Sequence, residues 1–201
     1  MTDAAPPSWA VPELGATGRL VGLPAFALRR SGDGGPPKLP TSVRVALRGG
    51  ELLARFDGRD AGVVATLTRR DDPLWTEDVF EVFLSPEAAP TRYYEFEVNP
   101  LGALFDARVD SPDGRRETMR VDAAWRCPGF TARVTRRRDR WSALVRIPLA
   151  PMQAPPVGVW RANFYRIDRG SPDEFSAWSP TGADPPDFHR PEAFGYLRLP
   201  G

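Results

Sequence analysis

Residues 141–147 read Trp-Ser-Ala-Leu-Val-Arg-Ile, and their apolar side chains recur at every second position. One face of this run carries Trp141, Ala143, Val145 and Ile147. Successive side chains of a β-strand point to opposite sides, so a period of two predicts a half-buried strand. We therefore expect this run to lay one face on an apolar core and to turn the other toward a more polar surface.

Similar short runs continue along the chain in both directions, separated by turn signals such as Asp-Gly, Gly-Gly and Ser-Pro. They cover residues 42–47, 51–57, 62–67, 78–85, 93–99, 103–109, 130–135, 159–168 and 194–199. Many short alternating runs with frequent turns are typical of antiparallel all-β folds. The sequence predicts a single antiparallel β-sandwich of two packed sheets and roughly ten short strands.

Length and composition agree with one domain. The chain has 201 residues, of which 41% are hydrophobic, so it can bury a core. Its 23 prolines and 18 glycines predict many turns, and only residues 149–153 could begin a helical turn. We expect residues 1–40 to form an extended lead-in and loop that belong to the same domain as the sandwich at residues 40–200.

Charge and cysteine content exclude several functional classes. A net charge of +1 argues against a nucleic-acid partner, and Cys127, the single cysteine, excludes an intrachain disulfide or a cysteine metal cluster. No apolar run approaches the roughly 20 residues that span a bilayer, which predicts no membrane insertion. Residues 1–12 lack the pattern of a signal peptide, so a cytoplasmic location is the default expectation. The oligomeric state is not fixed by the sequence.

Two tryptophans lie in polar, turn-rich surroundings. Trp75 follows Asp71-Asp72-Pro73-Leu74, and Trp178 lies between Ser176-Ala177 and Ser179-Pro180. Neither position fits a strand or helix period that would place it in a core. Exposed indoles are good platforms for flat, partly apolar ligands such as sugar rings. The pair therefore points to a binding site, provided that both side chains reach one cleft.

Polar side chains occupy one face of a predicted hairpin formed by residues 78–85 and 93–99. In its second strand Tyr93, Glu95, Glu97 and Asn99 point the same way. Such a face is either the solvated side of an antiparallel sheet or the polar floor of a ligand site. Residues 159–168 offer a similar choice at Asn163, because asparagine is disfavoured inside a strand.

Six segments together resemble carbohydrate-binding module family 9. They are Asp71-Asp72-Pro73-Leu74-Trp75, Glu81-Val82-Phe83-Leu84, Tyr93-Tyr94-Glu95-Phe96-Glu97-Val98-Asn99-Pro100, Trp160-Arg161-Ala162-Asn163-Phe164-Tyr165-Arg166, Trp178-Ser179-Pro180-Thr181 and Phe188-His189-Arg190-Pro191-Glu192-Ala193-Phe194-Gly195. The resemblance covers about residues 40 to 200. It implies a β-sandwich without catalytic activity that holds one or two sugar units.

The resemblance also implies a set of ligand-binding residues. Trp75 and Trp178 would hold the sugar between them, and polar side chains would bind its hydroxyl groups. The candidates for that polar role are Glu81, Asn99, Asn163 and Arg166.

Two other functions stay open at this point. The same aromatic cleft could hold a peptide loop of a protein partner. A glycoside hydrolase would need two carboxylates that flank the scissile bond, and Glu95 and Glu97 stand on one side of any ligand. His189, the only histidine, has no partner motif and is expected to make a structural hydrogen bond.

No cofactor is predicted. Some members of the resembled family carry structural calcium, for which the candidate oxygen ligands here are Asp57, Asp60, Asp71 and Asp72. Their spacing does not match an EF-hand loop, so we expect them to be scattered surface aspartates.

Overall fold

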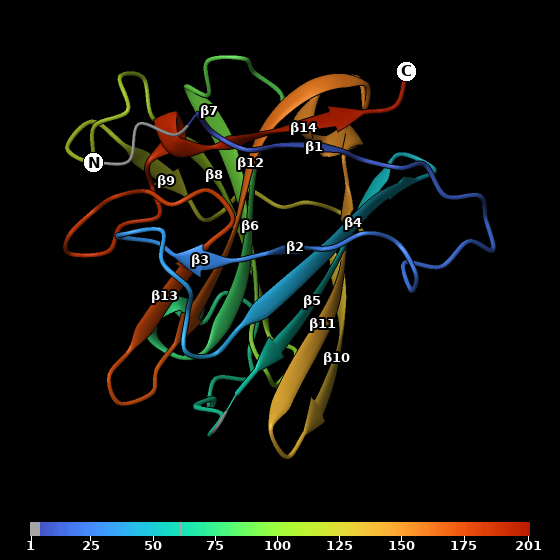
Figure 1. Ribbon diagram of the computed structural model, residues 1–201. Helices are drawn as coiled ribbons and strands as arrows, with labels where there is room; N and C mark the ends of the chain where they lie inside the picture. Colours follow the sequence, from blue (N-terminus) through green and yellow to red (C-terminus); the bar gives the residue numbers. More distant parts are fainter. Residues whose placement is uncertain (1–4, 61) are drawn as a thin grey trace.

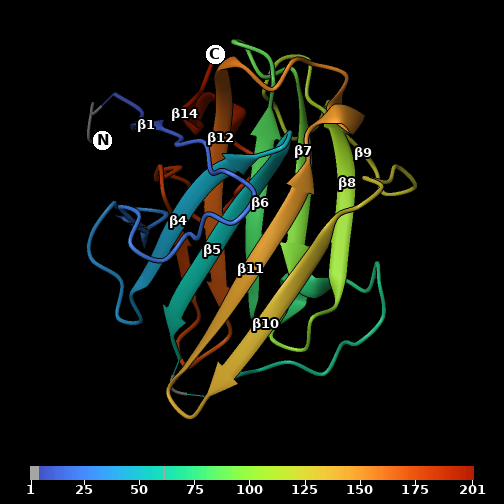
Figure 2. The same ribbon diagram turned by 90° about the vertical axis from the view of Figure 1, so that its right-hand side faces the viewer.

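Two β-sheets pack face to face in the computed structural model, which describes residues 5–60 and 62–201 (Figure 1). The strands of the smaller sheet run obliquely across those of the larger one behind them (Figure 2). The predicted all-β sandwich is therefore confirmed. Residues 1–4 of the predicted lead-in lie outside the described residues.

The larger sheet has nine strands, and its main path runs in the order β1-β14-β12-β6-β7-β8-β9. The short strands β13 and β3 extend it beside the second half of β12. All its neighbours pair antiparallel except β1 and β14, which are parallel. The strands are β1 (Ser8–Ala10), β3 (Arg29–Arg30), β6 (Val79–Ser85), β7 (Arg92–Val98), β8 (Leu104–Asp110), β9 (Arg120–Asp122), β12 (Gly158–Asp168), β13 (Glu174–Ala177) and β14 (Gly195–Leu199).

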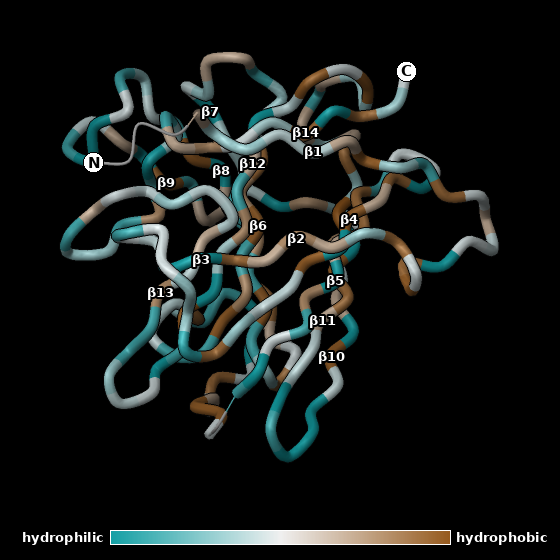
Figure 3. The backbone as a smooth tube through the Cα atoms, in the orientation of Figure 1, coloured by the Kyte–Doolittle hydropathy of each residue, from teal (hydrophilic) through white to brown (hydrophobic). Residues whose placement is uncertain are grey.

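The smaller sheet is antiparallel throughout, with its five strands in the order β10-β11-β5-β4-β2. They are β2 (Phe26–Ala27), β4 (Thr41–Arg48), β5 (Glu51–Arg59), β10 (Thr131–Arg137) and β11 (Arg140–Pro148). The tip of the β10–β11 hairpin is strongly hydrophilic and points away from the body of the sandwich (Figure 3).

Helical structure among the described residues is limited to three short 3₁₀ turns: η1 (Leu74–Thr76), η2 (Ala150–Met152) and η3 (Pro191–Ala193). The second of these is the helical turn expected at residues 149–153. Across residues 5–60 and 62–201, no helix is long and apolar enough to cross a membrane.

The main core lies between the two sheets. The apolar face of residues 141–147 points into it, as the alternation of this run predicts. Trp141, Ala143, Val145 and Ile147 are all buried there. The Phe80 ring stacks between two aromatic rings of the smaller sheet, 3.7 Å from the centroid of Trp141 and 4.7 Å from that of Phe56. Such close aromatic stacking joins β6 of one sheet to β5 and β11 of the other.

One expected strand does not form. Residues 62–67 are irregular because side chains, not a neighbouring strand, satisfy their backbone. The carboxylate of Glu77 accepts from the backbone N–H groups of Thr66 and Leu67, and that of Asp78 accepts from Val64. The sequence reading also missed five strands, β1, β2, β3, β9 and β13, which have only two to four residues each and show too little alternation to detect.

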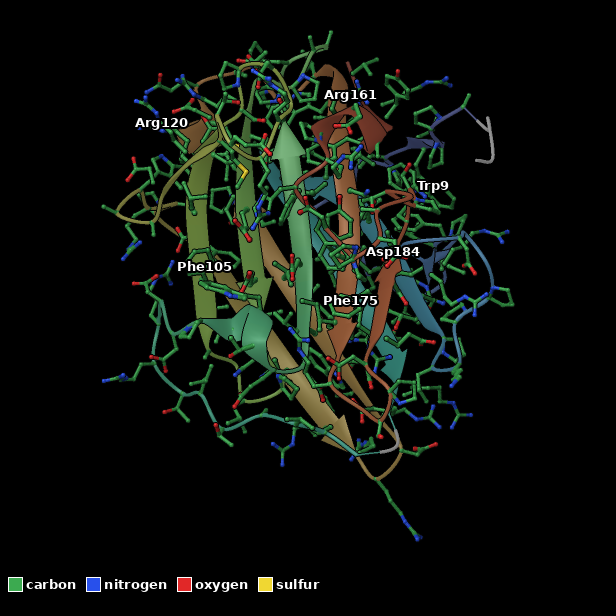
Figure 4. The ribbon with its side chains drawn as sticks, turned by 90° about the vertical axis from the view of Figure 1, so that its left-hand side faces the viewer. Trp9, Phe105, Arg120, Arg161, Phe175 and Asp184 are labelled. Atoms are coloured by element: carbon green, nitrogen blue, oxygen red, sulfur yellow. The ribbon has the colours of Figure 1, made fainter. Side chains whose placement is uncertain are left out.

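A second apolar cluster lies on the outer face of the larger sheet. It includes Phe83, Tyr93, Phe105, Tyr165 and Phe188. Loops that follow β8 and β13, together with the 3₁₀ turn η1, pack over this face, so part of it is enclosed although it is not between the sheets. Figure 4 looks onto this face, with Phe105 of β8 and Phe175 of β13 labelled on either side of it.

Candidate functional site

A pocket of about 440 Å³ opens on the outer face of the larger sheet. Strands β6, β7, β8 and β12 form its floor, and residues of η1, β13 and the 186–189 loop surround it. It is lined by Trp75, Glu81, Glu95, Glu97, Phe105, Arg116, Met119, Val121, Ile167, Arg169, Phe175, Pro186, Asp187, Phe188 and His189.

Strand register creates the floor. Glu81 of β6 lies opposite Glu97 of β7, and Tyr165 and Phe105 flank this pair on β12 and β8. Glu95 lies two residues before Glu97 on the same strand and therefore on the same face. The pocket floor thus has an acidic centre beside Phe105, and Tyr165 lies buried on the other side of the pair.

The three glutamates are removed from solvent, with exposed fractions of 2% for Glu81, 5% for Glu95 and 1% for Glu97. Burial raises the pKa of the Glu95 carboxyl group to about 7. Burial also raises the pKa values of Glu81 and Glu97 well above the usual range, and the neighbouring carboxylates add to both shifts. The floor therefore favours either bound protons or a positively charged species near these groups.

Trp75 stands at the rim of the pocket. It lies in η1, and the residue remains 43% exposed, an unusual state for a tryptophan. The ring packs edge-on against Phe105, with centroids 5.3 Å apart. This contact fixes the indole while leaving part of it free to stack on a ligand.

Phe175 of β13 supplies a second aromatic wall, and Arg169 connects it with Trp75. The Arg169 guanidinium lies 5.2 Å from the Phe175 ring centroid, and its Nη2 donates to the backbone oxygen of Trp75 at 2.6 Å. Arg169 also forms an ion pair with Asp173. One arginine thereby ties the segment that bears Trp75 to the strand that bears Phe175.

His189 makes the structural hydrogen bond that the sequence predicts. Its Nδ1 lies 2.8 Å from the hydroxyl oxygen of Tyr93, and its ring packs against Phe83. Burial lowers the pKa of His189 to about 4, with the nearby charge of Arg116 acting in the same direction. The imidazole is therefore neutral at physiological pH.

Two of the six predicted ligand residues line the pocket, namely Trp75 and Glu81. Trp178 does not. It is only 6% exposed and belongs to the core between the sheets, where its ring lies 4.9 Å from Phe26 and 5.8 Å from Phe164. The expected clamp of two tryptophans is therefore not formed in this structure.

Strand alternation explains the position of Trp178. Phe175 and Ala177 of β13 belong to the cluster on the outer face. Trp178 follows directly and is an odd number of residues from Phe175, so it points to the opposite side of the sheet. Phe175, not Trp178, is the aromatic side chain from this segment that reaches the pocket.

The other three predicted residues have structural partners away from the pocket. Asn163 exchanges two hydrogen bonds with the backbone of Ser179, at 2.8 and 2.9 Å. Asn99 donates to the backbone oxygen of Leu67 and accepts from two backbone N–H groups in its own turn. Arg166 points into the sandwich, where it is paired with Asp60 and Asp168.

Sequence reasoning underestimated Glu95 and Glu97. The sequence left open whether their polar face is solvated or forms a ligand floor, and the structure covers this face and makes it the floor of a pocket. The alternation identified the shared face, whereas the covering loops come from segments distant in sequence. Arg169, Phe105 and Phe175 were missed because no local pattern sets them apart from ordinary surface or core residues.

The four aspartates considered for structural calcium are engaged elsewhere, and the expectation that all of them lie on the surface is wrong for Asp60 and Asp72, which are buried. Asp57 pairs with Arg44 and Arg55, and Asp60 pairs with Arg166. Asp71 and Asp72 pair with Arg126 and Arg69, respectively. These residues therefore do not form a common set of free oxygen ligands and do not fit a structural calcium site.

A family model described as "Carbohydrate-binding family 9" matches residues 37–199. This range includes every strand that contributes to the pocket floor. The chain belongs to carbohydrate-binding family 9. That family consists of non-catalytic carbohydrate-binding modules, and the resemblance drawn from the six sequence segments is confirmed.

Solved structures agree with this family 9 fold. A candidate carbohydrate-binding protein from Bacteroides uniformis is 23% identical, with a TM-score of 0.78 over 96% of this chain and 99% of that one. A family 9 module from Caldicellulosiruptor kristjanssonii in complex with glucose is 13% identical, with a TM-score of 0.61 over 96% of both chains. The same type of module has been solved with cellotriose, at 13% identity and a TM-score of 0.60, over 97% of this chain and 93% of that one.

A curated relative bears on location. A protein from Arthroderma benhamiae is 28% identical over 165 residues, which cover 74% of this chain and 73% of the relative. It is described as an "Extracellular protein". The cytoplasmic location expected from the sequence is therefore not supported.

Proposed function

We propose that this family 9 domain binds carbohydrate, without transforming it, in the pocket beside Trp75. The observation that carries the proposal is the half-exposed indole at the rim of a pocket whose floor bears carboxylates. Aromatic faces cover the apolar face of a sugar ring, and carboxylates accept hydrogen bonds from its hydroxyl groups.

Trp75 and Phe175 are the proposed aromatic contacts, and Glu81 and Arg169 are the proposed polar contacts near them. Arg169 holds the Trp75 and Phe175 segments together through its backbone and ring contacts. The pocket volume of about 440 Å³ is adequate for a small saccharide. Family membership supports this choice of ligand class, as do related modules solved with glucose and cellotriose.

The arrangement of acids favours binding over hydrolysis. Glycosidases place two carboxyl groups on either side of the bond that is cleaved. Here Glu81, Glu95 and Glu97 all rise from adjacent positions of one sheet, so they contact a bound ring from the same side. We therefore propose a non-catalytic role for all three.

The test is a titration of intrinsic tryptophan fluorescence with glucose, cellotriose and a wider panel of mono- and oligosaccharides. Weak affinity, about micromolar to millimolar, is expected, because each sugar hydroxyl exchanges one hydrogen-bond partner for another. Trp75→Ala should abolish the response. Trp9→Ala is the matched control, because Trp9 packs against Phe26 in another part of the molecule.

Three results would contradict the proposal. Unchanged spectra across the panel would favour a protein partner in the same cleft. An equal response in the Trp75→Ala variant would place the sugar elsewhere. Turnover of aryl glycosides that is lost in Glu95→Gln would identify an enzyme instead.

A further inference from the structure

The three pocket glutamates approach one another more closely than separate surface acids would. One carboxylate oxygen of each of Glu81, Glu95 and Glu97 lies within 4.8 Å of the other two. Strand pairing enforces this, because Glu81 and Glu97 occupy directly opposed positions. Like charges in directly opposed positions destabilise a sheet, so this arrangement requires either bound protons or a compensating cation.

Glu97 provides an independent indication of a ligand. It is 99% buried, and neither of its carboxylate oxygens accepts a hydrogen bond from any residue that the structure describes. A buried carboxylate without a donor is costly, and native structures rarely leave one so. Glu97 is one of the residues that line the pocket, so the unsatisfied group lies directly beneath the pocket floor.

The arginines of the pocket are committed to other acids. Arg169 pairs with Asp173 and donates to the backbone of Trp75, and Arg116 pairs with Asp187. Neither hydrogen-bonds to any of the three glutamates in the described part of the chain. Neither pocket arginine therefore pairs with the acidic cluster, and its carboxyl groups have no cationic partner among the described residues.

We propose that Glu81, Glu95 and Glu97 bind one divalent cation, Ca²⁺, at the floor of the pocket. Hard oxygen ligands and a flexible set of carboxylates suit calcium better than the strict octahedron of magnesium. Calcium–oxygen distances of about 2.3–2.6 Å place opposite ligands about 5 Å apart, so oxygens that all lie within 4.8 Å of one another are close enough to share one ion. The inference goes beyond sugar binding and does not depend on it.

The size of the bound species follows from the accessibility of Glu97. Both of its carboxylate oxygens are out of reach of water in the pocket. A bulky ammonium group on a ligand would not contact them, whereas an ion seated among the three carboxylates would. Coordination positions on the open side would then face the pocket.

A second buried acidic cluster, Asp60, Asp78 and Asp168, serves as a contrast. Arg166 pairs with Asp60 and Asp168, and Asp78 accepts from two backbone N–H groups. Each of its carboxylates already has a hydrogen-bond or ion-pair partner, and none is left unsatisfied as Glu97 is, so it carries no cation proposal.

The test begins with protein treated with a chelator and then titrated with CaCl₂ by calorimetry, and in parallel with Tb³⁺, a luminescent substitute for calcium. We expect one ion per chain, a higher Tm with calcium, and Tb³⁺ emission excited through Trp75 at the pocket rim. Glu97→Gln should weaken binding by at least about 10-fold, and Glu117→Gln, at an exposed position, should not.

Folding of the variant can be judged separately. Glutamine keeps the shape of glutamate and lacks its charge, so Glu97→Gln should not lower the Tm of the calcium-free protein, while the rise in Tm with calcium should be lost. Trp75→Phe should bind calcium normally and lose the sensitised Tb³⁺ emission.

Absence of heat and of a Tm shift with millimolar calcium would overturn the proposal and indicate that the glutamates retain protons. Equal calcium binding by the Glu97→Gln variant would also overturn it. Sugar binding is measured independently by fluorescence, so loss of one activity leaves the other to be judged on its own result.

Discussion

Glu81 and Glu97 lie directly opposite each other on β6 and β7, and both are almost completely buried beneath a pocket that opens to solvent. A sheet built only for stability would not oppose two acids in this way. The pair is therefore the strongest local indication that this face of the sandwich serves a ligand.

Replacing Trp178 tests the separation of core from site. Trp178→Phe should destabilise the protein by about 1–3 kcal/mol, because it leaves a gap in the core, while sugar affinity should stay unchanged. The site is tightly filled, since a Cβ at Gly195 would lie 2.5 Å from the Trp178 ring. Urea unfolding and the fluorescence titration measure the two effects. A large loss of affinity in a stable variant would restore Trp178 to the binding site.

Replacing Phe175, in contrast to Trp178, should change sugar affinity. Phe175→Ala is expected to lower sugar affinity about 10-fold, corresponding to about 1.4 kcal/mol, because one aromatic wall of the pocket is removed. Phe175→Trp keeps an aromatic wall and should retain affinity. Calorimetric titration of both variants with cellotriose would decide the point, and equal affinity of the alanine variant and the unaltered protein would count against Phe175.

Arg166 should be essential for stability. Arg166→Ala would leave Asp60 and Asp168 as buried charges without their partner and should cost about 3–5 kcal/mol. Arg146→Ala removes a partly exposed pair with Glu51 and should cost less than about 1 kcal/mol. Denaturant unfolding at neutral pH gives both values. Similar costs for the two variants would show that burial does not set the strength of the Arg166 network.

His189 predicts a particular pH dependence. Its pKa in the folded protein is about 4, below the ordinary value of 6.5, so the unfolded chain takes up a proton first as the pH falls. The stability due to the neutral imidazole is fully present above about pH 6.5, declines from there to about pH 4, and amounts to roughly 3 kcal/mol at most.

The matched variant for that measurement is His189→Gln, which cannot titrate in this range. The difference in unfolding free energy between the two proteins should change between pH 6.5 and pH 4 and be constant above pH 6.5. Parallel curves throughout would mean that His189 titrates normally in the folded protein.

The sequence predicted the sandwich because alternation is a local property. The run from Trp141 to Ile147 and the hairpin that contains Glu95 and Glu97 each show their two faces without any knowledge of neighbours. The same alternation cannot tell which outer face loops will cover. For this reason the shared face of Glu95 and Glu97 could be identified, but its burial could not.

The site was only partly predictable for a related reason. Trp75 and Glu81 differ from what their sequence neighbours lead one to expect, because Trp75 is an indole in a turn and Glu81 is an acid in an apolar strand. Such contrasts can be seen in the sequence alone. Trp178 looked similar in sequence, yet its side depends on the register of β13, which is too short to show a period. Asn163 was recognised as unusual in a strand, but its partner, Ser179, and the partner of Arg166, Asp60, are set by tertiary packing.

The edges of both sheets have a consequence for behaviour at high concentration. The main path of the larger sheet ends in the three-residue strands β1 and β9, and the smaller sheet ends at the two-residue strand β2. The other edge strand of the smaller sheet, β10, is longer and carries Arg133, Arg136 and Arg137. Short or charged edge strands offer a poor template for pairing with a second chain. Strand β1 covers the edge of the longer strand β14. Deletion of β1 would expose that edge, so we expect the shortened domain to aggregate more readily.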